Sequence, residues 1–221
     1  MTAIITAVGG QKGGTGKSMI TGNLAVCAAR SGARVGIIDT DYSQNTIDKW
    51  HIVRGSRENV VPIECLIRTG ADVDTQLDAW RDTFDYIFID TNGSDSYELR
   101  KSLTYANWFI SPIRPQPSDN WTLGTVHSLF MQAREINHAL RCRIVISIVP
   151  THRGRRDVEV GSTLGAIRQY PGLEVCRTVI SDRSAYLRGW LSGQGVTELT
   201  SASLARDAIE EINTLHQEIY S

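Results

Sequence analysis

A glycine-rich segment near the start of the chain constrains the fold most strongly. It follows a short apolar run, Ile4–Val8, which predicts a buried strand, and it precedes Lys17–Ser31, which predicts a helix ending before Gly32. Five of the eight residues from 9 to 16 are glycines. Glycines let successive backbone N–H groups turn inward around an anion, and the helix directs its positive N-terminus to the same point. The segment therefore predicts a phosphate-binding loop that opens a βαβ unit.

The end of this loop carries the groups that a bound nucleotide requires. In Gly16-Lys17-Ser18, the lysine would reach the β- and γ-phosphates and the serine hydroxyl would ligate Mg²⁺. The usual pattern GxxxxGK[ST] is altered, because Gln11 stands where its first glycine is expected and a second lysine, Lys12, lies inside the loop. The expected nucleotide-binding residues are Gly13, Gly14, Thr15, Gly16, Lys17 and Ser18.

Strands and helices alternate along the rest of the chain. Further strands are expected at Arg34–Asp39, Val60–Leu66, Asp85–Asp90, Trp108–Ile113, Arg143–Val149 and Glu174–Ile180. Further helices are expected at Asp72–Thr83, Asn120–Leu140, Asp157–Tyr170 and Ala202–Tyr220. The alternation, with 41% hydrophobic and 21% charged residues, predicts a single α/β domain over residues 1–221. We expect a doubly wound, mostly parallel sheet flanked by helices.

Three aspartates lie at the ends of predicted strands. Asp39 ends the second strand, Asp41 follows two residues later, and Asp90 ends the strand at residues 85–90. Because the carboxyl ends of parallel strands share the edge where the phosphate loop lies, we expect these carboxylates near the phosphates. An aspartate after a strand can also cap a turn, but three of them beside such a loop favour a role with Mg²⁺ and the attacking water.

The stretch KGGTGKS at residues 12–18 resembles the deviant Walker A box, KGGxGK[ST], of the ParA/MinD family of ATPases. The resemblance implies a P-loop NTPase fold, ATP and Mg²⁺ as cofactors, and slow, partner-stimulated ATP hydrolysis. It also implies that Lys12 reaches across a dimer interface to the nucleotide of the partner. A cation supplied in trans would neutralise charge on the transferring phosphoryl group and would make dimerisation depend on ATP.

The resemblance also implies roles for the aspartates. Asp90 would be the Walker B residue, Asp39 would lie near the Mg²⁺, and Asp41 would orient the attacking water. The chain departs from the family pattern DxDPQ, because it reads Asp41-Tyr42-Ser43-Gln44, and Thr91-Asn92-Gly93 follows Asp90. We expect nucleotide binding to survive these changes and the hydrolysis rate to be affected by them. The expected catalytic residues are Lys12, Lys17 and Asp41, and the expected metal ligands are Ser18, Asp39 and Asp90.

Two further segments resemble the compact plasmid-partition ParA proteins, the proline-rich Ser111–Asp119 and Ile180–Leu191. This resemblance implies an ATP-dependent homodimer that binds DNA non-specifically and segregates plasmid or chromosomal DNA with a ParB-like centromere-binding protein. It implies a cytoplasmic protein that associates with the nucleoid when ATP is bound. It also suggests that Thr151 lies near the adenine.

Arginines supply candidate DNA contacts, although the formal net charge is only −1. The candidates are Arg153, Arg155, Arg156, Arg183 and Arg188. Phosphate contacts from such residues would give salt-sensitive, sequence-independent binding, but a solvated loop would carry the same cluster. The final helix is acidic, so we expect it to be repelled by anionic lipid, and we expect no membrane partner.

Other functions of the same fold stay open. A ParA-like protein could position a cargo other than DNA, and a ligase of the dethiobiotin-synthetase type would share the fold without needing Lys12. An electron carrier of the nitrogenase-reductase type would need cysteines in suitable loops. The four cysteines at positions 27, 65, 142 and 176 instead lie in or beside predicted helices and strands without CxxC spacing, so no metal cluster is expected.

Overall fold

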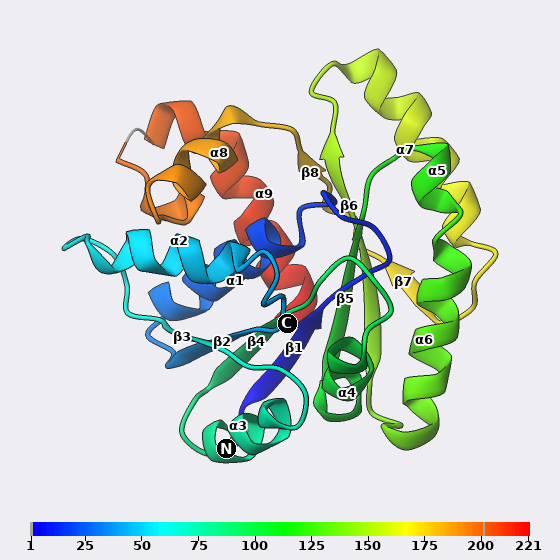
Figure 1. Cartoon of the computed structure of the whole chain (residues 1–221). Helices are drawn as coiled ribbons and strands as arrows, with labels where there is room; N and C mark the ends of the chain where they lie inside the picture. Colours follow the sequence, from blue (N-terminus) through cyan, green and yellow to red (C-terminus); the bar gives the residue numbers. More distant parts are fainter. Residues whose placement is uncertain (1, 201) are drawn as a thin grey trace.

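The computed structural model describes residues 2–200 and 202–221 and shows a twisted parallel sheet between two layers of helices (Figure 1). The strands are β1 (Ile4–Val8), β2 (Val35–Asp39), β3 (Glu64–Ile67), β4 (Tyr86–Asp90), β5 (Trp108–Ile113), β6 (Arg141–Val149), β7 (Leu173–Val175) and β8 (Ile180–Ser181). Their order in the sheet is β3-β2-β4-β1-β5-β6-β7, with β8 paired to β6. β1 therefore delivers the glycine-rich loop at the middle of the sheet, between β4 and β5.

Helices cover both faces of the sheet. They are α1 (Lys17–Arg30), α2 (Thr46–Gly55), α3 (Asp72–Trp80), α4 (Tyr97–Tyr105), α5 (Pro117–Asn120), α6 (Leu123–Ile136), α7 (Arg153–Ile167), α8 (Ser184–Leu191), the 3₁₀ helix η1 (Val196–Glu198) and α9 (Ala202–Tyr220). α1, α2, α8 and α9 pack into one core, and α3, α4, α6 and α7 pack into the other. In β4, Ile87 and Ile89 contribute to the second core and Phe88 to the first, as alternating side chains of a doubly covered strand must.

The predicted fold class is confirmed, but one predicted strand is wrong in its extent. Residues 174–180 are divided between β7 and β8. The carboxylate of Glu218 in α9 accepts hydrogen bonds from the backbone N–H groups of Arg177, at 2.6 Å, and Thr178, at 3.1 Å. These N–H groups are therefore bonded to a side chain rather than to a neighbouring strand.

Two predicted helices also have different bounds. The helix expected at residues 120–140 is shorter in the structure, where α6 begins at Leu123 and ends at Ile136, and the separate α5 precedes it. The next residue, Asn137, donates its side-chain amide to the carbonyls of Leu103, at 3.0 Å, and Ala106, at 2.7 Å. α7 begins at Arg153 rather than Asp157, so the first arginine cluster lies on a helix and not in a loop.

The sequence analysis missed three helices, α2, α4 and α8. They have 10, 9 and 8 residues, and each buries only three of them. One of the three is Arg54, Ser102 or Gly189, so the apolar repeat by which a helix is recognised is incomplete, whereas the predicted α3 buries three apolar residues, Val73, Leu77 and Trp80.

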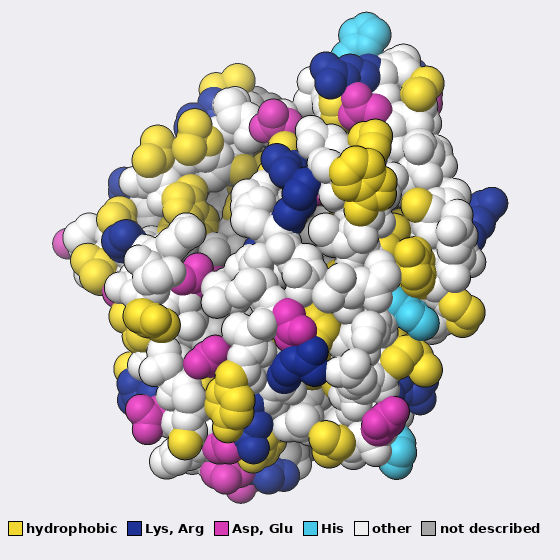
Figure 2. Space-filling view, turned by 45° about the vertical axis from the view of Figure 1, so that its right-hand side comes forward, with side chains coloured by type: hydrophobic (Ala, Val, Ile, Leu, Met, Phe, Trp, Pro, Cys, Tyr) yellow, Lys and Arg dark blue, Asp and Glu magenta, His cyan; other side chains and the backbone are white. Residues whose placement is uncertain are grey.

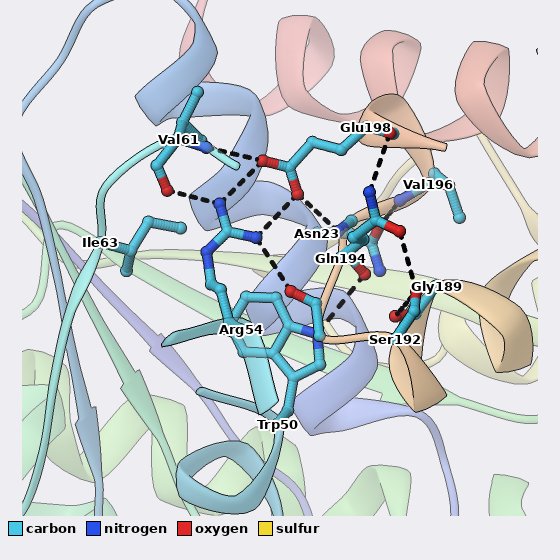
Figure 3. A network of polar contacts seen from close by, with 12 residues as sticks. Asn23, Trp50, Arg54, Val61, Ile63, Gly189, Ser192, Gln194, Val196 and Glu198 are labelled. Carbon is cyan, nitrogen blue, oxygen red and sulfur yellow. Dashed lines mark hydrogen bonds and ion pairs between the residues drawn. The ribbon is translucent and has the colours of Figure 1, made fainter. Parts of the chain in front are cut away.

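A buried ion pair fastens α2 to the segment that follows α8 (Figure 3). Arg54 Nη1 and Nη2 donate to the two carboxylate oxygens of Glu198, both at 2.7 Å. Both side chains are nearly inaccessible, with 3% and 2% exposed. Beside this pair, the rings of Trp50 and Trp190 stack with centroids 5.6 Å apart. The network therefore holds α2, which follows the predicted site residue Asp41, against α8.

Candidate nucleotide site

The glycine-rich loop connects β1 to α1 and opens on a cavity of about 360 Å³. Gly14 and Gly16 have φ angles of 71° and 84°, a region that glycine adopts without steric strain. A Cβ atom built on Gly13 or Gly14 would meet no atom within 4 Å, so this part of the loop faces open space. Thr15 instead lies behind the loop, where its carbonyl accepts a hydrogen bond from the Ser147 hydroxyl at 2.8 Å. The loop thus presents its backbone to a ligand in the cavity.

Lys17 lines this cavity but is turned toward the loop. Its side-chain amine donates to the backbone carbonyl of Lys12 at 2.7 Å, and the residue is only 7% exposed. Burial lowers the pKa of the amine, while the negative charges of Asp90 and Asp41 act in the opposite direction. An amine held this way is poised for an anion, because a phosphate oxygen in the cavity would replace a neutral acceptor with a charged one.

Asp90 lies at the end of β4, under the first turn of α1. Its carboxylate accepts hydrogen bonds from the Ser18 hydroxyl at 2.6 Å and the Thr21 hydroxyl at 2.9 Å. Burial raises the pKa of Asp90 to about 7, and the hydrogen bond from Ser18 opposes this shift. A cation bound beside Asp90 would favour the charged form of its carboxylate.

The other two aspartates follow β2, beside Asp90. Asp39 is fully buried and lies opposite Asp90 in the register of β2 and β4. Its carboxylate accepts hydrogen bonds from the backbone N–H groups of Asp41, at 2.9 Å, and Asp48, at 3.2 Å. Burial raises its pKa, and these backbone hydrogen bonds lower it by less. Asp41 lines the cavity, and its carboxylate accepts a hydrogen bond from the Ser43 hydroxyl at 2.6 Å. The structure thus brings the three carboxylates to the edge of the sheet where the loop lies.

The donor set suits Mg²⁺ that arrives with a nucleotide. Among the described residues, no group of three or more His, Cys, Asp or Glu side chains could hold a metal ion. Mg²⁺ commonly binds through one or two carboxylates, waters and substrate phosphates rather than in an all-protein cage. Ser18 and Asp90, whose oxygens lie 2.6 Å apart, would supply protein oxygens for such an ion, with Asp39 beside them.

Lys12 points away from the cavity. Its amine donates to Asp119 Oδ1 at 2.5 Å and to the Ser118 hydroxyl at 2.7 Å. Asp119 also accepts hydrogen bonds from Arg114. The sequence analysis noted the proline-rich segment ending at Asp119 but missed its contact with Lys12, because the two residues are 107 positions apart.

One wall of the cavity was not predicted. Tyr186, Leu187 and Trp190 of α8 line it together with residues of the loop. Thr151, predicted to lie near an adenine, instead lines a separate pocket of about 330 Å³ with Asp182 and other residues. Its contact with a nucleotide stays a prediction.

The candidate DNA-binding arginines differ in how far they are free to bind phosphate. Arg183 is bound by Asp207 at 2.8 Å and Glu211 at 3.0 Å. Arg155 pairs with Glu159 at 2.6 Å. Within the described part of the chain, Arg153, Arg156 and Arg188 have no ion-pair partner. Figure 2 shows Lys and Arg side chains interspersed with Asp and Glu over the face in view.

The parallel sheet, the loop and the strand-end carboxylates together define a nucleotide-binding P-loop domain. The family model described as the CobQ/CobB/MinD/ParA nucleotide binding domain matches residues 6–215. The chain belongs to this family, and the resemblance to the ParA/MinD ATPases is confirmed.

Solved structures share the fold over nearly the whole chain. MinD from Pyrococcus horikoshii, complexed with Mg-ADP, is 16% identical over 99% of this chain and 96% of its own, with a TM-score of 0.72. A variant of McdA from Cyanothece, complexed with ATP, is 12% identical over 97% of this chain and 96% of its own, with a TM-score of 0.71. A plasmid partition protein from Borrelia burgdorferi is 17% identical over 87% of this chain and 96% of its own, with a TM-score of 0.64. At these identities the likeness shows the fold alone.

A curated relative matches only part of the chain. An iron-sulfur cluster carrier protein from Pseudomonas fragi is 45% identical over 67 residues, which are 27% of this chain and 23% of that protein. The match therefore spans less than a quarter of the relative's length. None of the helices in residues 2–200 and 202–221 combines the length and the apolar character needed to cross a membrane.

Proposed function

We propose that this protein is an ATP-dependent dimerising ATPase of the partition type. The observation that carries the proposal is the meeting of Lys17, Ser18 and Asp41 at one cavity, with a second lysine, Lys12, in the same loop. Solved proteins with this fold that are complexed with ATP and with Mg-ADP support a bound nucleotide for this chain.

Each residue at the cavity would have a separate role in nucleotide binding or hydrolysis. Lys17 would leave the carbonyl of Lys12 and bind the β- and γ-phosphates. Ser18, Asp39 and Asp90 would hold Mg²⁺, which supplies charge neutralisation on the phosphates when it is bound. Asp41, on the cavity wall, would orient the water that attacks the γ-phosphate.

Lys12 would act on the nucleotide of a second copy. Its side chain is 33% exposed, and Lys12 is not among the residues that line the cavity of its own chain. A lysine supplied in trans would neutralise developing charge only in the dimer, and hydrolysis would then be slow in the monomer.

The proposed cargo is plasmid or chromosomal DNA, bound without sequence preference in the ATP state, in a cytoplasmic protein that associates with the nucleoid. A ParB-like centromere-binding partner would stimulate hydrolysis and release the DNA. Arg153, Arg156 and Arg188, which have no ion-pair partner among the residues that the structure describes, are better placed to bind phosphates than Arg155 and Arg183, which are bound by carboxylates.

The test is binding to random-sequence duplex DNA with ADP and with a slowly hydrolysed ATP analogue. We expect binding only with the analogue, and at least a tenfold loss of affinity between about 50 and about 200 mM salt. The double variant Arg153→Ala/Arg156→Ala should bind more weakly with a shallower salt dependence, whereas Arg81→Ala, directly after α3 at the opposite edge of the sheet, should bind like the wild type. Binding that is the same with ADP and with the analogue would contradict an ATP-switched DNA contact.

Positioning of a cargo other than DNA is the second candidate. It is favoured by the neutralised arginines Arg155 and Arg183 and by the likeness in fold to McdA and MinD. No DNA binding in either nucleotide state, together with dimerisation in the ATP analogue, would replace the DNA proposal with this one.

A further inference from the structure

The strand β6 carries an irregularity close to the phosphate loop. Ser147 and Val149 of β6 lie opposite two consecutive residues of β8, so a single step along β8 spans two steps along β6. Ile148 is therefore an extra residue, and its φ angle is 54°. A β-branched residue is sterically unfavourable in this left-handed region, and such a conformation persists only where the surrounding structure imposes it. Bulges and strained residues of this kind are concentrated beside functional sites.

The bulge turns two consecutive side chains toward the phosphate loop. In a regular strand Ile146 and Val149 would lie on opposite faces, yet both pack into the core that α6 covers. The alternation is therefore shifted by one residue between them, which leaves Ser147 and Ile148 on the side of the loop. A Cβ atom built on Gly16 of the loop would lie 4.0 Å from the side chain of Ile148.

Ser147 holds the loop through a backbone carbonyl. The residue is fully buried, and its hydroxyl donates to the carbonyl of Thr15 at 2.8 Å. The carbonyl of Ile113, at the end of β5, lies 3.3 Å from the same hydroxyl. A hydroxyl has a single proton to donate, and the shorter contact identifies Thr15 as its main acceptor. A side chain anchored in β6 thus fixes the direction of a peptide group in the loop.

This peptide group joins Thr15 to Gly16, and its other end faces the ligand site. The peptide is planar and trans, so the N–H of Gly16 points in the direction opposite to the Thr15 carbonyl. The carbonyl points to β6 behind the loop, and Gly16 lines the cavity. No backbone carbonyl in the described part of the chain accepts a hydrogen bond from this N–H. It is therefore a donor available to an anion in the cavity.

We propose that Ser147 is a positioning residue for nucleotide binding, whose hydroxyl holds the Thr15 carbonyl so that the Gly16 N–H points at a phosphate. The bulge at Ile148 supports this role, because its extra residue keeps Ser147 at the loop while β6 still pairs with β8. The N–H so directed contributes a charge-assisted hydrogen bond to the phosphate. The proposal rests on nucleotide binding at the loop in the proposed function.

The first test measures the order of the Gly16 amide in nucleotide-free protein by NMR relaxation. The wild type should give an order parameter of about 0.85, as in rigid backbone, and Ser147→Ala should lower it toward about 0.6. Ser102→Ala is the matched control, because Ser102 is also fully buried and donates to a backbone carbonyl, that of Glu98 in α4, at 2.6 Å. It should leave Gly16 at the wild-type value. Equal order of Gly16 in the wild type and in Ser147→Ala would overturn the proposal.

The second test measures the Kd of Mg-ADP and of inorganic pyrophosphate by calorimetry. Ser147→Ala should weaken the binding of both about tenfold, because a misdirected N–H no longer donates a charge-assisted hydrogen bond. Pyrophosphate carries the phosphates without the base, so an equal factor for the two ligands locates the effect at the phosphates. Ser102→Ala should bind both like the wild type. A loss confined to Mg-ADP would contradict a role at the phosphates.

Ser147→Cys keeps the tests usable if Ser147→Ala folds poorly. A thiol occupies nearly the same space as the hydroxyl and is a weak donor, so an intermediate loss of affinity, about threefold, is expected. If Ser147→Ala does not fold and Ser147→Cys matches the wild type in both measurements, the proposal is wrong.

The two measurements separate this proposal from the proposed function. If the wild type binds neither Mg-ADP nor pyrophosphate, nucleotide binding at the loop fails, while the order of the Gly16 amide still decides whether Ser147 holds the loop. If the wild type binds both ligands and Ser147→Ala changes neither affinity nor the order of Gly16, the proposed function stands and Ser147 has no positioning role.

Discussion

The three aspartates of the site differ in their access to the cavity. Asp39 and Asp90 are 0% and 1% exposed and are fixed by hydrogen bonds from the backbone and from α1 hydroxyls. Asp41 lies partly exposed on the cavity wall. Buried oxygens with fixed neighbours suit a metal ion, whereas a carboxylate at the wall can hold a water molecule.

Asp41→Ala should separate binding from turnover. Removing the carboxylate should reduce ATP turnover about a hundredfold, because the attacking water loses its orienting base. Nucleotide binding, measured by titration with a fluorescent ATP analogue, should change little. Ser43→Ala is the control, since it removes the hydroxyl that donates a hydrogen bond to Asp41 at 2.6 Å but leaves the carboxylate of Asp41 in place. Normal turnover in Asp41→Ala would assign the water to another residue.

At the scale of helices and strands, the cavity depends on how α2 and α8 are held. Both are short, and they meet through the stacked rings of Trp50 and Trp190 and the ion pair of Arg54 with Glu198. α8 supplies Tyr186 and Trp190 to the cavity wall. A change in the ion pair is therefore expected to affect both stability and the shape of the site.

Glu198→Gln should destabilise the protein by about 3–5 kcal/mol, because it leaves the buried guanidinium of Arg54 without its charged partner. Urea unfolding would measure this loss. The double variant Arg54→Met/Glu198→Met should recover most of it, since an apolar pair of similar volume avoids an unpaired buried charge. Glu58→Gln, a change at an exposed residue between α2 and β3, should be within about 0.5 kcal/mol of the wild type. A small effect of Glu198→Gln would mean that the pair contributes little.

The final helix, α9, carries a half-buried histidine, His216. His216 packs against the rings of Tyr86 and Tyr220, and its Nε2 atom has no hydrogen-bond partner among the residues that the structure describes. Burial lowers the pKa of His216, so the folded protein binds this proton at a lower pH than the unfolded chain does. The unfolded state therefore gains the proton first as the pH falls below about 6.5, and stability decreases.

His216→Phe should make the free energy of unfolding less dependent on pH between about 7.5 and about 5.5, because it removes this titration. Urea unfolding at several pH values would show a smaller loss of stability on acidification than in the wild type. His138→Gln changes an exposed histidine and should keep the wild-type dependence. Equal pH dependence in all three proteins would show that His216 is not titrating differently in the folded state.

At the scale of the whole molecule, one ligand would contact segments from both halves of the chain. The cavity is bounded by the loop after β1, the segments after β2 and β4, and α8. A ligand that binds only the folded chain stabilises all of these together in proportion to the logarithm of its concentration relative to its Kd.

Mg-ATP at about a hundred times its Kd should stabilise the protein by about 2.7 kcal/mol, which corresponds to roughly 5–10 °C in Tm for a domain of this size. Removal of Mg²⁺ with a chelator should reverse much of the shift, because phosphate charge would be left uncompensated beside the carboxylates. Lys17→Met should abolish the shift, while Lys101→Met, outside the cavity, should keep it. Thermal unfolding followed by circular dichroism decides between these outcomes.

Local pattern was enough to predict the phosphate loop and the strand-end aspartates. The loop, Lys17 and Ser18 are consecutive residues whose geometry follows from glycine and a helix start, and Asp39 and Asp90 follow from strands that end at one edge of a parallel sheet. The short helices α2 and α8 could not be predicted, because one of the three residues that each buries is Arg54 or Gly189, which interrupts the apolar repeat.

Other contacts of the candidate site residues join segments that are far apart in the sequence. Asp119 meets Lys12 across 107 residues, and Glu211 of α9 binds Arg183 across 28. α8 lines the same cavity as the loop, although it lies more than 160 positions further along the chain. Which side chains meet over such separations follows from strand order and helix packing, and a linear pattern of residues does not contain them. The composition of the phosphate site can therefore be derived from consecutive residues, whereas the contact of Lys12 with Asp119 and the pairing of the arginines follow from packing in three dimensions.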